Sequence, residues 1–226
     1  MKMKNRSSMI IKVIAIIASI YGMIRSFDSL MFFTYFTNLS NIFIDVMLVI
    51  FLIYDIQGVK YRPQGMHIIK FMATISITLT FLVYMFLLAP TNSHGFMGAY
   101  LHNGAGSLCV HFITPVLSII DFIMYSYDYD AKEKHVFYAV VPPLIYVGYV
   151  IVLGQCFYMR WDQTMLAPYN FLNYGAKTGW FGFDLSLLGH TTLGIGTFYM
   201  IIILLVIFIG LGSLFLKIRR KNTILY

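Results

Sequence analysis

The sequence predicts an all-α, polytopic membrane protein that crosses the bilayer six times and forms one domain over residues 1–226. Of these residues 59% are hydrophobic and only 11% are charged, whereas an average soluble domain has about 25% charged residues. The mean hydropathy is +0.78. The apolar residues are gathered in six runs of roughly 20 residues, the length that a helix needs to span a bilayer. Runs this long, without strict alternation, do not fit strands.

The six runs are separated by polar, charged or glycine-rich stretches, such as IQGVKYRPQG at 56–65 and YDYDAKEK at 127–134. The first run follows the basic segment MKMKNR but lacks a convincing small-residue cleavage site. We therefore expect an uncleaved first span rather than a removed signal peptide. The predicted spans are residues 8–25, 31–54, 68–89, 105–126, 136–158 and 191–216.

The distribution of Lys and Arg predicts that both termini are cytoplasmic. Thirteen of the 16 Lys and Arg residues fall on one side of the predicted spans, and only Arg25, Arg160 and Lys177 fall on the other. Positive charge collects on the cytoplasmic side of membrane proteins, so we expect a multi-pass protein of the cell membrane with segments 89–106 and 159–190 facing outward. The net charge of +7 then reflects topology, and no nucleic-acid partner is expected.

Two of the predicted helices carry polar residues along one face. Successive residues of a helix turn by about 100°, so polar residues spaced by three and four fall on one side. Polar groups that face lipid are costly, and two such stripes in a small bundle should therefore face each other. The stripes are Thr34, Thr37, Asn38, Asn41 and Asp45 in the second span, and Asn103, Ser107, His111, Thr114, Ser118 and Asp121 in the fourth.

Thr37 and His111 are predicted to lie at the same depth in the membrane. Each is about six residues below the outer start of its predicted span, which places both about 9 Å below the outer surface. Pro115 has no N–H for the carbonyl of His111, so the helix should be distorted beside the imidazole. A hydroxyl and an imidazole at one level provide a nucleophile and its general base.

The two aspartates lie too deep to act on this pair. Asp121 is ten residues beyond His111, about 15 Å along the helix axis, and Asp45 is eight residues beyond Thr37. We expect both near the inner interface, either solvated or paired with lysines. His67 and His135 are expected to be solvated at cytoplasmic helix ends.

Histidines on the outer side offer an alternative, metal-dependent site. Imidazole is a good zinc ligand, and His94, His102 and His190 could join His111. However, no pair has the close HxxxH spacing of a metal motif. Cys109 and Cys156 both lie in apolar runs and indicate neither a metal site nor a disulfide framework. We therefore expect no metal and no other cofactor.

The stretch FTYFTNLSN in the second span and HFITP in the fourth resemble motifs of the androgen-induced gene 1 family. That family includes the androgen-dependent TFPI-regulating protein and bacterial members, and its animal members are six-span intramembrane threonine hydrolases. The resemblance implies a nucleophile at Thr37 and a base at His111, with Thr34 as the rival nucleophile. It also implies esters of a fatty acid with a hydroxy fatty acid as substrates.

These features predict an intramembrane hydrolase that cleaves fatty-acyl esters near the outer leaflet. The side-chain amides of Asn38 or Asn41 would stabilise the oxyanion, and Thr34, His102 and His190 are secondary site candidates. The expected partners are the lipid bilayer and a fatty-acyl ester. Three alternatives stay open: a channel or transporter whose polar stripes line a solute path, a metal-dependent membrane enzyme, and an assembly factor without a catalytic site.

Overall fold

The computed structural model describes residues 2–102, 104–161, 165–169, 172 and 195–224. The described chain is largely helical and confirms the predicted all-α, multi-pass fold. Six helical segments are long and apolar enough to cross a membrane: Arg6–Ser26, Phe36–Ile56, Gln64–Phe86, Gly106–Tyr125, Glu133–Cys156 and Ile201–Lys221. The chain divides into two compact units, one of Met1–Ala139 with Leu211–Tyr226 and one of Val140–Gly210.

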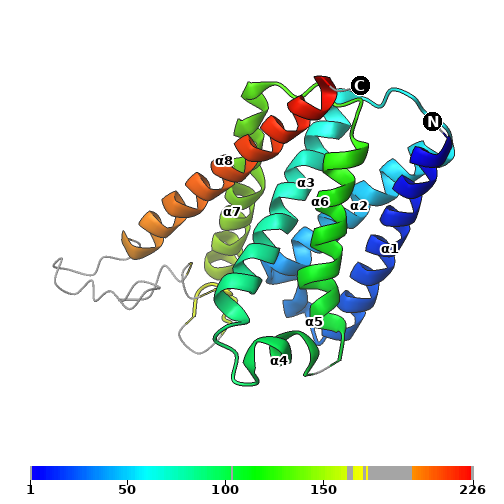
Figure 1. The fold of residues 1–226 in the computed structure, drawn as a ribbon. Coiled ribbons are helices and arrows are strands. Elements are labelled where there is room, and N and C mark those ends of the chain that lie inside the picture. Colours follow the sequence, from blue (N-terminus) through cyan, green and yellow to red (C-terminus); the bar gives the residue numbers. More distant parts are fainter. Residues whose placement is uncertain (1, 103, 162–164, 170–171, 173–194, 225–226) are drawn as a thin grey trace. The chain divides into compact units, whose positions relative to one another are not determined.

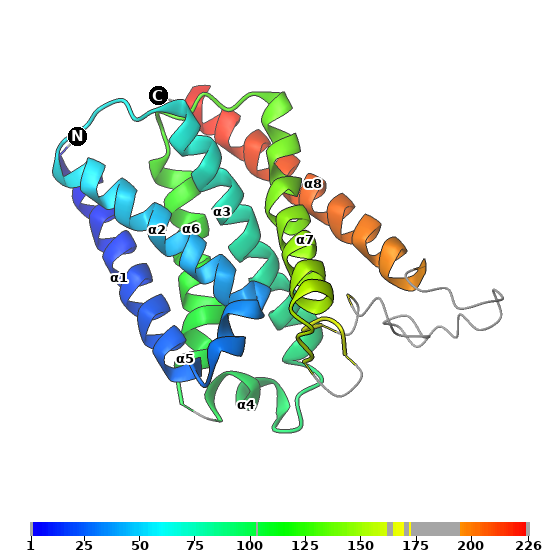
Figure 2. The ribbon, with the colours of Figure 1, turned by 180° about the vertical axis from the view of Figure 1, so that it is seen from behind.

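The first unit is a bundle of four main helices, α1 (Lys2–Ser26), α2 (Phe36–Ile56), α3 (Gln64–Val83) and α6 (Thr114–Tyr125). Helices α1 and α3 each pack against both α2 and α6, and successive helices run in opposite directions (Figures 1 and 2). The last part of α8 (Ile195–Ile224), from Leu211 onward, also belongs to this unit. There Phe215 packs on Phe122, with ring centroids 5.9 Å apart.

The middle of this bundle is apolar. On α2, the side chains of Ile44, Leu48 and Phe51 are buried, and their spacing of four and three residues places them on one face of the helix. They join residues of α1 and α3 in one cluster. Its members are Ala15, Ile44, Met47, Leu48, Phe51, Ala73 and Ile77. Buried polar side chains also occur at this level: Asp45 and Thr74 adjoin members of the cluster, and the Thr114 hydroxyl donates to the carbonyl of Ala15 at 3.4 Å.

The second span begins later than the sequence predicts. Leu30–Thr34 form a separate 3-10 turn, η1, and Tyr35 is extended (φ −87°, ψ 131°) before α2 begins at Phe36. Ser29 stabilises the start of η1 because its side chain accepts a hydrogen bond from the N–H of Met31. Thr34 and Thr37 consequently lie on different elements, and the predicted single helix from residue 31 is wrong at its first turn.

Two spans contain a π-helical turn near the end where α4 (Gly95–Leu101) lies. The fourth span runs from α5 (Gly106–Leu108) through the π turn η3 (Cys109–Ile113) into α6, and the N–H of Thr114 donates to the carbonyl of Cys109, five residues back. The predicted distortion beside Pro115 is therefore a widened turn. A second π turn, η2 (Tyr84–Leu88), ends the third span. Such turns are frequent at functional sites.

The fifth span changes helix type instead of bending in its middle. The 3-10 segment η4 (Glu133–Val140) leads into α7 (Val141–Cys156), and prolines occupy the first positions of α7. A proline there lacks only an N–H that would have no partner within the helix. In the second unit, Arg160 donates from its guanidinium to the carbonyl of Gly154 at the end of α7. Most of the aromatic segment 159–190 and the first residues of the predicted span 191–216 lie outside the described residues.

Candidate functional site

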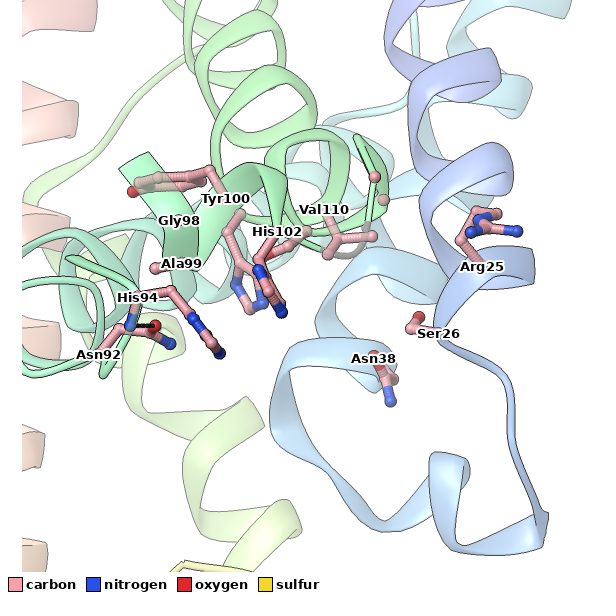
Figure 3. A pocket seen from close by; sticks show the side chains of 14 residues that line it. Arg25, Ser26, Asn38, Asn92, His94, Gly98, Ala99, Tyr100, His102 and Val110 are labelled. Atoms are coloured by element: carbon pink, nitrogen blue, oxygen red, sulfur yellow. Dashed lines mark hydrogen bonds between the residues drawn. The ribbon is translucent and has the colours of Figure 1, made fainter. Parts of the chain in front are cut away.

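A cavity of about 380 Å³ lies at one end of the first unit, a size within the range of small-molecule sites. Residues of α1, α2 and the segment from α4 to η3 surround it. Arg25 and Asn38 lie on one side and His94 and His102 on the other (Figure 3). The polar lining includes Arg25, Asn38, His94, His102, Ser107 and His111.

The lining of this cavity favours negative charge. It combines the guanidinium of Arg25 with three imidazoles and the side-chain amides of Asn38 and Asn92. No carboxylate is found among the described residues that line it. Donors and cations arranged in this way stabilise an anionic group or a negative charge that develops during a reaction.

His111 is placed in the cavity wall by the π turn η3. Its ring stacks on the ring of Tyr84, with centroids 3.7 Å apart and an angle of 11° between the ring planes. The Nδ1 atom is buried and has no hydrogen-bond partner within the described part of the chain. Because no hydrogen bond at Nδ1 fixes this imidazole, its orientation depends on the stacking of its ring face on Tyr84.

The backbone of Thr37 lies close to the backbone of η3 beside His111. The Nδ2 atom of Asn41 donates to the carbonyl of Thr37 at 2.9 Å and to the carbonyl of Val110 at 3.3 Å. One nitrogen thus bridges Thr37 and the residue that precedes His111. Thr37 is the second residue of α2 and not six residues inside a helix, and its common depth with His111 in the membrane stays a prediction. Thr37 itself does not line the cavity, whereas its neighbour Asn38 does.

The two predicted oxyanion donors have different environments. Asn38 faces the cavity, while its Nδ2 donates to the carbonyl of Phe32 at 2.9 Å. Asn41 is fully buried, and its Oδ1 accepts from Ser19 at 3.3 Å. Because its Nδ2 is also bonded to two carbonyls, Asn41 ties α1, α2 and η3 together and does not face the cavity. The prediction that Asn41 supplies an oxyanion donor therefore does not fit the structure.

Thr34, the rival nucleophile, is buried away from the cavity lining. Its hydroxyl donates to the carbonyl of Met31 within η1 at 2.7 Å. The break at Tyr35 explains this difference from the prediction, because Thr34 does not continue the polar face of α2.

His94 and His102 form a stacked pair at the cavity wall. Their ring centroids are 3.6 Å apart and their planes differ by 10°. Gly98 permits this arrangement, since a Cβ at that position would lie 2.5 Å from the Cβ of His94. Parallel stacked rings do not converge on one ion, and the described residues contain no group of three or more metal-binding side chains. His190, the remaining candidate ligand, lies outside the described residues.

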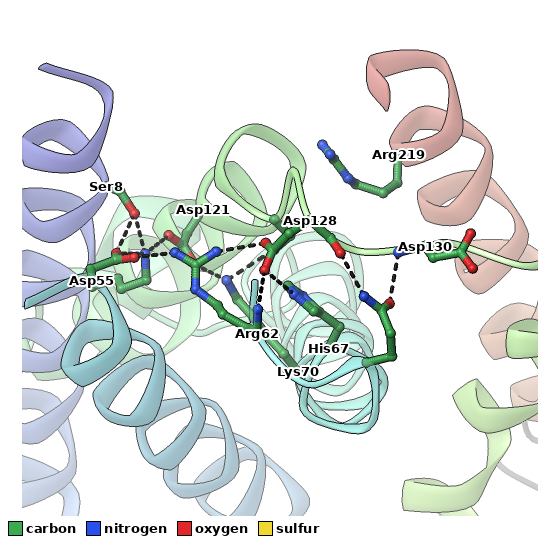
Figure 4. Close-up of polar contacts among 12 residues, drawn as sticks. Ser8, Asp55, Arg62, His67, Lys70, Asp121, Asp128, Asp130 and Arg219 are labelled. Carbon is green, nitrogen blue, oxygen red and sulfur yellow. Dashed lines mark hydrogen bonds and ion pairs between the residues drawn. The ribbon is translucent and has the colours of Figure 1, made fainter. Parts of the chain in front are cut away.

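A buried ionic cluster occupies the opposite end of the first unit (Figure 4). Asp121 pairs with Lys12 at 2.7 Å and with Lys70 at 2.5 Å, and Lys12 also pairs with Asp55 at 2.9 Å. The side chains in these pairs are at most 1% exposed. Of the two alternatives expected for Asp121, solvation or pairing with lysines, the structure shows pairing.

Arg62 extends this ionic cluster through the loop between α2 and α3. It pairs with Asp55 and, at 2.7 Å, with Asp128, whose other carboxylate oxygen lies 3.1 Å from Nε2 of His67. Although burial lowers the pKa of Arg62, the charges of Asp128 and Asp55 outweigh it and raise that pKa. Burial raises the pKa of Asp128, but the His67 ring and Arg62 lower it to about 2.

The ionic cluster corrects several expectations about charged residues. Lys12, Arg62 and Lys70 were counted among the basic residues that signal topology, and His67 was expected to be solvated at a helix end, yet all four are buried. His135 is also buried, and its Nδ1 lies 2.8 Å from the hydroxyl of Tyr129. Three cations balance the three carboxylates of Asp55, Asp121 and Asp128, which makes such burial tolerable.

Asp45 is neither solvated nor paired with a lysine. It is 8% exposed, and both of its carboxylate oxygens are without a hydrogen-bond partner within the described chain.

Sequence reasoning missed the polar face of α1. Ser8, Lys12 and Ser19 lie on the same side of the helix as Ala15 and Gly22, at spacings of four and three residues. Ser8 donates to Asp55 at 2.8 Å, and Ser19 donates to Asn41. The periodicity was therefore a usable signal that α1 faces both polar stripes. The sequence offered no comparable signal for Tyr84.

Comparison of the chain with protein-family models, with curated proteins and with solved structures finds no match.

Proposed function

We propose that this protein is an intramembrane hydrolase of fatty-acyl esters, with Thr37 as the nucleophile and His111 as the general base. The main support is the cavity in which His111 lies beside cationic and hydrogen-bond-donating groups at one end of an apolar bundle. The bridge that Asn41 makes between the Thr37 and Val110 carbonyls supports the pairing of these two elements.

The reaction would proceed in two steps. The Thr37 hydroxyl attacks the ester carbonyl while His111 takes its proton, and His111 then protonates the leaving alkoxide as the ester C–O bond breaks. Water, activated by His111, next attacks the acyl-threonine, releasing the fatty acid and restoring the hydroxyl. The Asn38 amide and the cationic lining would stabilise the negative oxygen that forms in each step. The proposal requires the Thr37 hydroxyl to reach the cavity from its position beside Asn38.

We also propose that the protein lies in the cell membrane with both termini in the cytoplasm. The start of α1 and the end of α8 lie at the end of the first unit that carries the ionic cluster (Figures 1 and 4). Most of the Lys and Arg residues belong to this end, which favours its placement in the cytoplasm. The cavity would then open toward the outer leaflet, where an ester group near the lipid headgroups could enter.

The alternative of a channel or transporter finds less support. A solute path would have to continue from the cavity to the ionic cluster. The apolar cluster of Ala15, Ile44, Met47, Leu48, Phe51, Ala73 and Ile77 lies between these two polar regions along α1, α2 and α3.

Covalent labelling tests the proposed hydrolase. We expect an ester-mimicking fluorophosphonate probe to label the wild-type protein, and Thr37→Ala and His111→Ala each to abolish labelling while the protein still folds. Thr78→Ala and His135→Ala are matched controls, because both residues are buried outside the cavity lining. If both site variants are labelled like the wild type, the proposal fails; loss only in Thr34→Ala would move the nucleophile to that residue.

A further inference from the structure

The face of the His111 ring is covered by Tyr84. The two rings are nearly parallel, at 11°, with centroids 3.7 Å apart. A catalytic histidine is commonly oriented by a hydrogen bond at its second ring nitrogen. In the described chain the Nδ1 atom of His111 has no such partner. Stacking on Tyr84 is therefore the contact that limits rotation of this imidazole.

Tyr84 is itself held at both its ring and its hydroxyl. Its O–H donates to the carbonyl of Ala99 in α4 at 2.5 Å. Because a phenol has only one proton to donate, its oxygen accepts from the hydroxyl of Ser107, 2.7 Å away in α5. The ring of Tyr100 packs against that of Tyr84 in a tilted arrangement, with centroids 5.0 Å apart. A tyrosine fixed at so many points makes a rigid support.

The backbone places the two stacked rings in matching irregular turns. Tyr84 begins the π turn η2, and His111 is the central residue of the π turn η3. A π turn contains one residue more than an α turn and so changes the direction of the side chains that follow. Both turns lie at the cavity end of the first unit. The irregular turns and the stacked rings they carry are therefore parts of one arrangement.

We propose that Tyr84 is a positioning residue for His111: it holds the imidazole in the orientation needed for proton transfer while its own hydroxyl anchors it to α4 and α5. The part that concerns catalysis rests on the proposed hydrolase function. The part that concerns the orientation of the ring rests only on the contacts of Tyr84. The aromatic face of Tyr84 stacks on His111, and its hydroxyl forms hydrogen bonds with Ala99 and Ser107.

Substitutions that separate the ring from the hydroxyl test this proposal. Tyr84→Phe keeps the stacked ring and removes both hydrogen bonds, whereas Tyr84→Leu removes the ring. We expect Tyr84→Leu to lower the rate of probe labelling per folded molecule about a hundredfold, because small displacements of a catalytic group cost rates of that order. Tyr84→Phe should retain most of the rate, and its KM for an ester substrate should stay near the wild-type value.

A second measurement does not depend on any enzymatic activity. In protein labelled with ¹³C-histidine and held in lipid nanodiscs, the His111 ring signal is assigned by its loss in His111→Ala. Stacking on an aromatic face should shift this signal upfield in the wild type and in Tyr84→Phe. The shift should disappear in Tyr84→Leu and in Tyr84→Gln, a second ringless variant that is used if the first does not fold.

The outcomes distinguish the two proposals. If the probe labels neither the wild type nor any variant but the His111 signal responds as expected, the hydrolase function fails and the positioning of His111 by Tyr84 stands. If Tyr84→Leu lowers only the yield of folded protein, while the rate per folded molecule and the His111 signal stay unchanged, Tyr84 is merely structural. Equal loss of rate in Tyr84→Phe and Tyr84→Leu would assign the effect to the hydroxyl and overturn the role of the ring.

Discussion

The carboxylate of Asp121 shows how single residues decide the stability of this protein. It is fully buried and pairs with two lysines from two different helices, Lys12 of α1 and Lys70 of α3. Each lysine would be costly to bury without a counter-charge. A buried pair of this kind adds little compared with an apolar replacement of both partners, but removal of one partner leaves an uncompensated charge.

Asp121→Asn should therefore destabilise the protein strongly. The change leaves Lys12 and Lys70 with less negative charge in a buried site, and the expected loss is about 3–5 kcal/mol in the free energy of unfolding. Unfolding of the purified protein in mild detergent, by denaturant titration, measures it. Asp130→Asn is the control, because the Asp130–Lys132 pair is 65% and 56% exposed and should contribute about 0–1 kcal/mol. Similar losses in the two variants would contradict a special role of burial.

Asp128 should make the free energy of unfolding depend on pH. Its pKa is lowered from 3.8 to about 2 in the folded protein, so the unfolded chain binds this proton more readily. The stabilisation from Asp128 is therefore complete above about pH 4 and is lost as the pH falls through about 2. We expect the stability difference between wild type and Asp128→Asn to shrink over this interval in unfolding measurements at several pH values. A difference that stays constant down to pH 2 would argue against the charged contact with Arg62.

At the scale of the elements, close packing of α1 against the fourth span sets the position of η3. A Cβ at Gly22 would lie 2.8 Å from the carbonyl oxygen of Gly106 and 2.6 Å from Cγ1 of Val110. The glycine thus lets α1 approach the backbone of α5 and the side chain of Val110 in η3, the turn that carries His111. Prolines in the fourth and fifth spans and the two π turns shape the spans in the same local way, by changing which backbone groups are bonded.

Gly22→Ala should disturb both stability and the site. The added methyl group meets backbone, which cannot rotate away, so α1 and α5 must separate at a cost of about 1–3 kcal/mol. We expect a lower unfolding midpoint together with slower labelling by the ester-mimicking probe. Gly65→Ala in the first turn of α3 provides the comparison, since a Cβ there meets nothing within 4 Å and alanine favours a helix. An unchanged midpoint in Gly22→Ala would show that α1 adjusts without loss.

At the scale of the whole molecule, the first unit has one polar cavity and one ionic cluster at opposite ends, with apolar packing between them. Burial of Lys12, Arg62, Lys70 and Arg219 removes four basic residues from the surface charge that orients a membrane protein. The remaining basic residues at that end, such as Lys60 and Lys134, still outnumber those on the opposite side. The positive-inside argument for orientation therefore survives this correction.

Accessibility of single cysteines should reveal this orientation. In a background with Cys109 and Cys156 replaced, a membrane-impermeant maleimide should label Asn92→Cys on intact cells, because Asn92 belongs to the cavity end. Lys132→Cys, at the end of the ionic cluster, should be labelled only after the membrane is permeabilised. The reverse pattern would place the cavity in the cytoplasm and would exclude a substrate that enters from the outer leaflet.

Composition and the length of the apolar runs predict the class of protein and its six spans, because both are properties that a linear sequence displays. For Asp121 the sequence left solvation and pairing with lysines as alternatives. Three features became visible only in the folded chain: Asn41 is bonded to two carbonyls, Thr34 belongs to another turn, and Tyr84 covers the imidazole of His111. These features depend on contacts between residues far apart in the chain, and on local breaks in the helices at Tyr35 and in the π turns. Such contacts and breaks leave the average hydropathy and the periodicity of a span unchanged, so the sequence does not display them.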